Sequence, residues 1–142
     1  MISANRGLLT IWVIALLFGC GTGPDPTQEF CEAVIELEAI DRLSFDVSPS
    51  DDAAVRGALT QTAAQAARVA REAPLEIRGD AEVVAAFVLA LTQAFDDTEF
   101  SEPLQRSARV GAVQQQFDDQ LTDSVENLTA FIARRCSPSP NQ

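Results

Sequence analysis

Apolar residues recur at every third or fourth position along four stretches of this 142-residue chain. That spacing puts apolar side chains on one face of an α-helix, whereas a half-buried strand would alternate at every second residue. The first stretch, residues 26–43, begins after Asp25, which can cap a helix whose first position is Pro26. The pattern predicts an all-α fold.

The second and third stretches predict two more helices, separated by Pro74. Ser48 as the N-cap and Pro49 at the first position predict the start of the second helix, which is rich in alanine. Pro74 disfavours helical geometry at the residue before it and so ends that helix. The third helix is expected over residues 75–96, and its uncharged segment 83–91 predicts that it is the most buried of the four.

Pro103 opens a fourth helical region that reaches Arg135. Thirty-odd residues at about 1.5 Å each would overshoot the first helix by about 20 Å. We therefore expect a break near Gly111 or near residues 117–118, which would add one short helix. The sequence therefore predicts an antiparallel up-and-down four-helix bundle over residues 26–136, followed by a disordered tail at 137–142.

The N-terminal region has the features of an export signal. Arg6 precedes an uncharged apolar run, residues 8–18, which is shorter than the roughly 20 residues that a spanning helix needs. Leu17, Gly19 and Cys20 then resemble the lipobox of bacterial lipoprotein precursors, although Phe18 departs from the usual small or modest aliphatic residue. An ordinary cleaved signal and an uncleaved anchor are the alternatives.

The lipobox resemblance implies cleavage between Gly19 and Cys20 and attachment of diacylglycerol, with acyl chains such as palmitate, to Cys20. Residues 1–19 would be the signal peptide and residues 20–25 a lipidated tether. The protein would then lie on the outer face of the cell membrane, held by a lipid anchor. The absence of lysine, together with abundant alanine and arginine, indicates a GC-rich bacterium. The layout also resembles the small all-helical lipoproteins of high-GC Gram-positive bacteria.

Acylation of Cys20 would leave two cysteines, Cys31 and Cys136, in an oxidising compartment. An even number of antiparallel helices brings the two ends of the chain to the same pole of the bundle. Cys31 lies in the first turns of the first helix, and Cys136 comes directly after the last. We therefore predict that one Cys31–Cys136 disulfide closes the bundle.

The composition excludes several kinds of chemistry. The chain has no histidine and no lysine, so His-based catalysis and metal sites, Schiff bases and P-loops are excluded. The formal net charge of −11 argues against nucleic acid and against electrostatic adhesion to anionic lipid. The acidic segment 96–102 suggests calcium, but it lacks the spacing of an EF-hand. The adjacent pairs Asp51–Asp52 and Asp118–Asp119 point about 100° apart on a helix and do not converge.

We therefore predict no enzyme activity, no metal and no cofactor. The predicted function is a membrane-anchored, non-catalytic interaction module of the bacterial envelope, with another envelope protein as the possible partner. The alternative is a carrier of a small apolar ligand or lipid. It would use a cavity between the alanine-rich second helix and the Val- and Phe-rich third helix.

Overall fold

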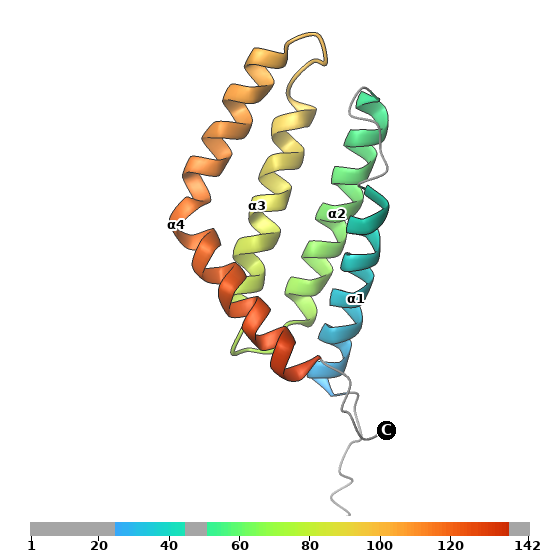
Figure 1. Ribbon diagram of the computed structural model, residues 1–142, viewed down its shortest axis with the longest axis vertical. Coiled ribbons are helices and arrows are strands. Elements are labelled where there is room, and N and C mark those ends of the chain that lie inside the picture. The colour runs from blue at the N-terminus through green and yellow to red at the C-terminus, as the bar shows by residue number, and fades with distance from the viewer. Residues whose placement is uncertain (1–24, 45–50, 137–142) are drawn as a thin grey trace, which may run out of the picture.

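The computed structural model describes residues 25–44 and 51–136, and this part of the chain forms four helices and no strand. The helices are α1 (Pro26–Ser44), α2 (Asp52–Glu72), α3 (Arg78–Asp96) and α4 (Pro103–Arg135). They run up and down, each packed against the next in chain order (Figure 1). The predicted four-helix bundle is thus confirmed. The predicted signal peptide, the Gly19–Cys20 processing site and the tail lie outside the described residues.

The start of α1 agrees with the prediction from the sequence. The Asp25 carboxylate accepts the backbone N–H of Thr27 at 2.9 Å, and its carbonyl oxygen accepts the N–H of Gln28 at 2.8 Å. These contacts satisfy two of the N–H groups that a helix start leaves without partners. Asp25 therefore fixes where α1 begins.

The start of α2 differs from the prediction. Asp51, not Ser48, is the N-cap, because its carboxylate accepts the N–H of Ala54 at 3.0 Å. Its backbone angles, φ −95° and ψ 88°, are not helical, so α2 begins at Asp52. Helix α2 therefore begins after the Asp51 cap and not at the start that the sequence predicts, Ser48 followed by Pro49.

The connection between α2 and α3 is a tight turn around Pro74. Ala73 is extended (φ −63°, ψ 131°), as expected for a residue before proline. The Arg78 guanidinium donates from Nε and Nη2 to the Ala73 carbonyl oxygen at 3.1 and 3.0 Å, which satisfies a carbonyl at the end of α2. Because Ile77 N–H bonds back to the Pro74 carbonyl at 3.0 Å, α3 begins at Arg78, later than predicted.

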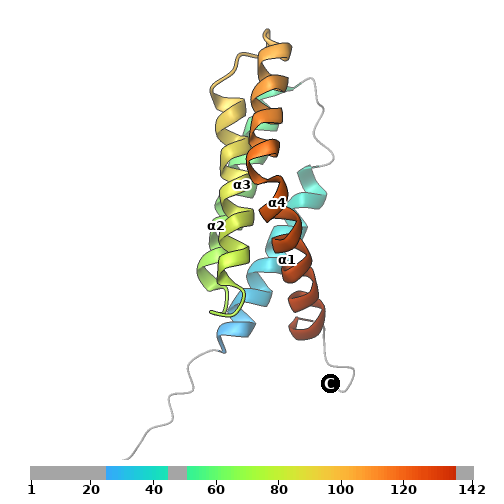
Figure 2. The ribbon, with the colours of Figure 1, turned by 90° about the vertical axis from the view of Figure 1, so that its left-hand side faces the viewer.

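The predicted break in the last helix is wrong, since α4 is one continuous helix of 33 residues. It bends along its length without interruption (Figure 1). Figure 2 shows it running beside α3 and then turning toward α1 at its lower end. Because α4 crosses the bundle diagonally, its greater length than α1 is accommodated without a break. Contact between α4 and α1 is therefore short and includes the edge-to-face pair Phe30–Phe131, with ring centroids 5.6 Å apart.

The buried core lies at the end of the bundle where α1 begins and α4 ends. Phe30 is fully buried, and Phe131 is 4% exposed. The rest of this core consists of smaller side chains, namely Ala33, Val34, Val69, Ala70, Ala73, Ile77 and Ala81. All four helices contribute to it, and the small residues let the backbones approach closely.

The prediction that α3 is the most buried helix is not confirmed, since three residues are buried in α2 and three in α3. Its fully buried residues are small, and Phe87, Val88 and Leu91 remain partly exposed. Phe87 instead packs edge-to-face on Phe117 of α4, with ring centroids 5.7 Å apart. Helix α3 packs against α2 and α4 but makes little contact with α1, so its large apolar side chains are covered from two sides.

Candidate functional site

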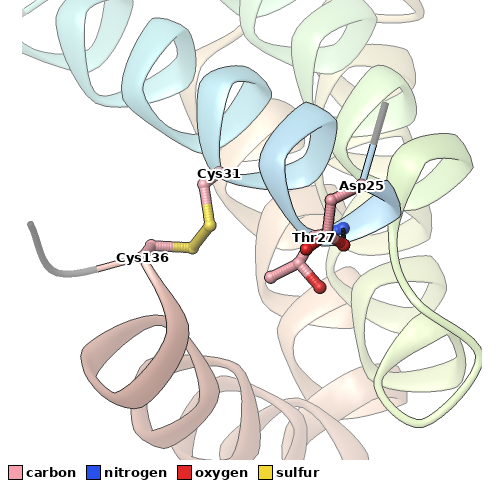
Figure 3. Close-up of a disulfide and its surroundings, with 4 residues drawn as sticks. All are labelled: Asp25, Thr27, Cys31 and Cys136. Carbon is pink, nitrogen blue, oxygen red and sulfur yellow. Dashed lines mark hydrogen bonds between the residues drawn. A yellow bond between two sulfur atoms is a disulfide. The ribbon is translucent and has the colours of Figure 1, made fainter. Parts of the chain in front are cut away.

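The two ends of the bundle carry different chemistry. One end, here called the disulfide pole, holds the start of α1, the α2–α3 connection and the end of α4. Cys31 and Cys136 are joined there by a disulfide (S–S 1.98 Å, Cα–Cα 5.3 Å), which links positions 105 residues apart (Figure 3). The predicted pairing is confirmed. The disulfide ties the first turns of α1 to the residue that follows α4.

The opposite end, here called the distal pole, is organised around Asp52. Its carboxylate accepts Arg56 Nε at 2.7 Å through Oδ2 and Arg106 Nη1 at 2.8 Å through Oδ1. Arg56 lies on α2 and Arg106 on α4, so one carboxylate joins the first turns of two helices. The side chains of Asp52, Arg56 and Arg106 are 24%, 25% and 14% exposed.

The same two arginines hold the connection between α3 and α4. The Thr98 carbonyl oxygen accepts Arg56 Nη2 at 2.5 Å and Arg106 Nη2 at 3.1 Å. The Thr98 hydroxyl accepts Arg106 Nε at 3.1 Å and lies 2.9 Å from the Ala94 carbonyl oxygen, to which it donates. Thr98 is buried, so these charged donors satisfy polar atoms that water does not reach. Asp52, Arg56, Thr98 and Arg106 are called the distal cluster below.

Aromatic rings complete this arrangement. The guanidinium carbon of Arg106 lies 5.0 Å from the ring centroid of Phe95 and 5.9 Å from that of Phe100. Both distances allow a cation–π interaction. Arg106 thus lies within reach of the ring of Phe95 on α3 and of the ring of Phe100 in the α3–α4 connection.

A small exposed apolar surface lies beside the distal cluster. Phe100 is 54% exposed and Leu104 is 86% exposed. Exposed acids occupy the same segment of the chain, at Asp96, Asp97, Glu99 and Glu102. Phe100 and Leu104 together with these acids are called the tip surface. It presents apolar contact area with an acidic surrounding on a connection that the distal cluster holds in place.

The electrostatics of the distal cluster favour fixed charges. The hydrogen bond from Arg56 lowers the pKa of the Asp52 carboxyl against the opposing effect of burial, and the hydrogen bond from Arg106 lowers it further. The same hydrogen bond with Asp52 raises the pKa of Arg56. A carboxylate held ionised between two guanidiniums is a poor proton donor, and each of its oxygens already accepts a hydrogen bond. The geometry suits a structural clamp better than acid–base catalysis.

The structure separates the other acidic candidates. Asp51 caps α2, and Asp52 belongs to the distal cluster. Asp118 and Asp119 lie exposed on α4. Over residues 25–44 and 51–136, no group of three or more Asp, Glu, Cys or His side chains has an arrangement that fits a metal ion. The acidic segment 96–102 instead contributes to the tip surface.

The distal cluster was not predicted from the sequence. The spacing of four residues between Asp52 and Arg56 on a helix is a recognisable signal for an ion pair. Arg106, however, is 54 residues from Asp52 in the chain and offers no such signal. Its partner becomes evident only when the fold brings the first turns of α2 and α4 to the same end of the bundle.

Open grooves also mark the surface between the helices. One, of about 520 Å³, lies between α2 and α3 and is mainly apolar. Its lining includes Ala63, Ala67, Ala86 and the half-exposed Leu89. A larger hollow of about 820 Å³ lies between the start of α3 and the end of α4, where acidic and arginine side chains both line it. Of the two, the α2–α3 groove is the one whose lining suits an apolar ligand.

Comparison with known proteins gives no relative for this chain: no family model, curated protein or solved structure matches it. Assignment of the site therefore depends on sequence and geometry. Within the helices that the structure describes, none is long and apolar enough to cross a bilayer.

Proposed function

We propose that this protein is a lipoprotein of the bacterial cell envelope that acts as a non-catalytic interaction module. The apolar run 8–18 and the residues Leu17, Gly19 and Cys20 support export and acylation. Two or more acyl chains give stable attachment, at about 0.8 kcal/mol for each buried CH₂ group. The bundle would then be held on the outer face of the membrane by Cys20.

The tip surface is the observation that carries the interaction part of the proposal. Phe100 and Leu104 are large and exposed, and Arg106 binds Thr98 of the connection that carries Phe100. A pre-organised apolar contact loses little conformational entropy when a partner binds. The surrounding acids favour a partner with basic groups around an apolar pocket. The proposed partner is therefore an envelope protein with a basic-rimmed apolar site.

Photo-crosslinking in intact cells tests the interaction. A photoreactive amino acid at Leu104 should give the same adduct in repeated experiments, and the added change Phe100→Ser should remove it. The control carries the photoreactive residue at Val125, which is 45% exposed on the same helix. A position-104 probe that yields no reproducible adduct, or one that matches the position-125 pattern, would refute docking at the tip surface.

The intact mass of the protein extracted from membranes tests the anchor. The expected mass is that of a chain beginning at Cys20, with diacylglycerol attached and two hydrogens missing because of the Cys31–Cys136 disulfide. A chain that begins at Cys20 without acyl groups, or one that retains the leader, would refute the lipoprotein assignment.

A carrier of a small apolar ligand is the second candidate, and the α2–α3 groove favours it. The groove has an apolar lining of alanines and Leu89 and a volume of about 520 Å³. Native mass spectrometry of the protein released from its anchor would detect a bound lipid or other apolar molecule. A ligand-free mass, with no adduct when a fatty acid is added, would exclude this candidate.

A further inference from the structure

Leu75 is a large aliphatic residue that the fold leaves almost entirely in solvent. It lies in the α2–α3 connection and is 85% exposed. It borders a surface hollow of about 470 Å³ that Asp25 and Thr27 also line, together with Arg135 at the end of α4. Leu75 therefore shares one surface with the residue at which the described chain begins, on the disulfide pole.

The length of chain before Asp25 limits how far this surface can stand from an anchor at Cys20. Five residue steps separate Cys20 from Asp25 and span at most about 18 Å when fully extended. Helices α2 and α3 have 21 and 19 residues, so each is about 30 Å long. The disulfide pole stays within reach of the bilayer surface, while the distal pole is at the far end of the bundle.

The side of the bundle formed by α1 is unsuited to lie on lipid. Glu29, Glu32 and Glu36 are exposed along it. Anionic headgroups repel such a face, and the repulsion falls off within a Debye length. An orientation with the disulfide pole toward the bilayer leaves Glu29, in the first turn of α1, near that pole but keeps Glu36, about two turns further along, away from the headgroups.

Arg78 and Arg135 line the same hollow as Leu75 at the disulfide pole, together with the acidic side chains of Asp25 and Glu76. Arg71, Arg134 and Arg135 are exposed, and none of the ion pairs among the described residues involves them. A guanidinium can bind a lipid phosphate with two parallel hydrogen bonds. An exposed leucine beside such groups fits the boundary between headgroups and acyl chains.

We propose that the disulfide pole rests on the membrane, with Leu75 inserted into the interfacial layer of the lipid bilayer that holds Cys20. This inference depends on the proposed lipid anchor and adds an orientation to it. Leu75 is then a second, weak membrane contact that limits tilting of the bundle. The tip surface faces away from the bilayer, where a partner can reach it.

The chain provides a clean fluorescence test. Its one tryptophan is Trp12, which belongs to the leader and is absent from a chain that begins at Cys20. A tryptophan placed by Leu75→Trp is therefore the sole indole of the mature protein. Leu104→Trp is the matched control, because Leu104 is 86% exposed at the opposite pole. Each variant is reconstituted with its acyl anchor into phosphatidylcholine vesicles that contain, or lack, lipids brominated along the acyl chains.

The expected result is quenching of the position-75 indole by brominated lipid and a blue shift of its emission, with neither change at position 104. Quenching at position 104 alone, at both positions, or at neither would overturn the proposed orientation. Glu76→Trp, at an exposed neighbouring position, provides a second probe of the same surface if Leu75→Trp fails to fold by circular dichroism.

The intact mass of the same samples separates the two proposals. An acylated chain whose position-75 indole is not quenched refutes the orientation and leaves the anchor intact. A chain without acyl groups refutes the anchor, and the orientation that depends on it fails as well.

Discussion

Arg106 Nη1 lies 2.8 Å from Asp52 Oδ1 and so joins the first turn of α4 to the first turn of α2, two helices that otherwise pack on opposite sides of α3. The same guanidinium binds both the carbonyl and the hydroxyl of Thr98. One side chain thus connects α2, the α3–α4 connection and α4. The distal pole is held by polar contacts, whereas the disulfide pole is held by the apolar core.

Replacing Arg106 by alanine should lower the free energy of unfolding by about 1–3 kcal/mol, because the buried oxygens of Thr98 lose charged donors. Arg106→Lys should recover little of the loss, since an ammonium cannot reproduce the planar fork of donors. The control is Arg109→Ala. Arg109 is half-exposed, and its contact with Asp97 is 3.5 Å long, so we expect a change of less than about 1 kcal/mol. Urea unfolding gives the stability of all three variants. Equal losses in Arg106→Ala and Arg109→Ala would contradict a special stabilising role for Arg106.

The stability that Asp52 contributes should depend on pH in the acid range. Its folded pKa is lowered from the ordinary value of 3.8, with the Arg56 hydrogen bond as the main cause. The contribution is therefore complete above pH 3.8 and is lost as the pH falls through the lower folded pKa. Asp52→Asn should remove this dependence. Urea unfolding at a series of acid pH values gives the free energy of unfolding of the two proteins. If it falls with pH equally in both, Asp52 does not make the stabilising contacts with Arg56 and Arg106 described above.

Removing the disulfide should cost about 4–5 kcal/mol in the chain-entropy model, because it closes a loop of about one hundred residues. The variant Cys31→Ala/Cys136→Ala is compared with the parent protein under oxidising conditions, by urea unfolding. Addition of a thiol reductant should lower the stability of the parent to that of the variant. A parent protein that is insensitive to reductant would contradict the role given to the disulfide.

Truncation of Phe30 should be among the most damaging single changes. The side chain is fully buried and packs edge-to-face on Phe131, so Phe30→Ala should lower the free energy of unfolding by about 3–5 kcal/mol. Ile35 on the same helix is 61% exposed. Ile35→Ala should therefore change stability by no more than about 0.5 kcal/mol. Thermal or urea unfolding measures the stability of both variants. Similar losses of stability would show that Phe30 does not lie in the core.

Two helical glycines offer a stabilising change. A Cβ atom added at Gly57 of α2 or at Gly111 of α4 meets no atom within 4 Å. Alanine costs less backbone entropy than glycine in a helix, so each Gly→Ala change should raise stability by about 0.5–1 kcal/mol. The sites lie on different helices, so the gains should add. A loss of stability at either site would reveal a close contact that the structure does not show.

The sequence predicts the parts of this fold that depend on local spacing. Helical periodicity gives the four helices, and Asp25 gives the start of α1. The pairing of Cys31 with Cys136 followed from the helix count and the positions of the two cysteines, once Cys20 was assigned to the lipid anchor. These features need no knowledge of how the helices tilt.

The parts that were missed depend on tertiary placement. The length of α4 suggested a break, yet a bent and diagonal helix accommodates the same residues without one. The apolar pattern of α3 suggested deep burial, but among the described helices α3 packs against α2 and α4, and its large apolar side chains stay partly exposed. Arg106 and Asp52 are 54 residues apart in the chain, so the local sequence pattern does not predict their ion pair.

The disulfide also determines how the molecule bears a mechanical load. Cys31 lies six residues after Asp25, and Cys136 directly follows α4. Tension between the segment before Asp25 and the segment after Cys136 passes through one turn of α1 and then through the covalent S–S bond. Phe30, directly before Cys31, lies on this path, whereas the core residues after Cys31 and the distal cluster are shielded from that force. The bundle can be pulled from its two ends without being unravelled, and reduction of the disulfide exposes the whole domain to the pull.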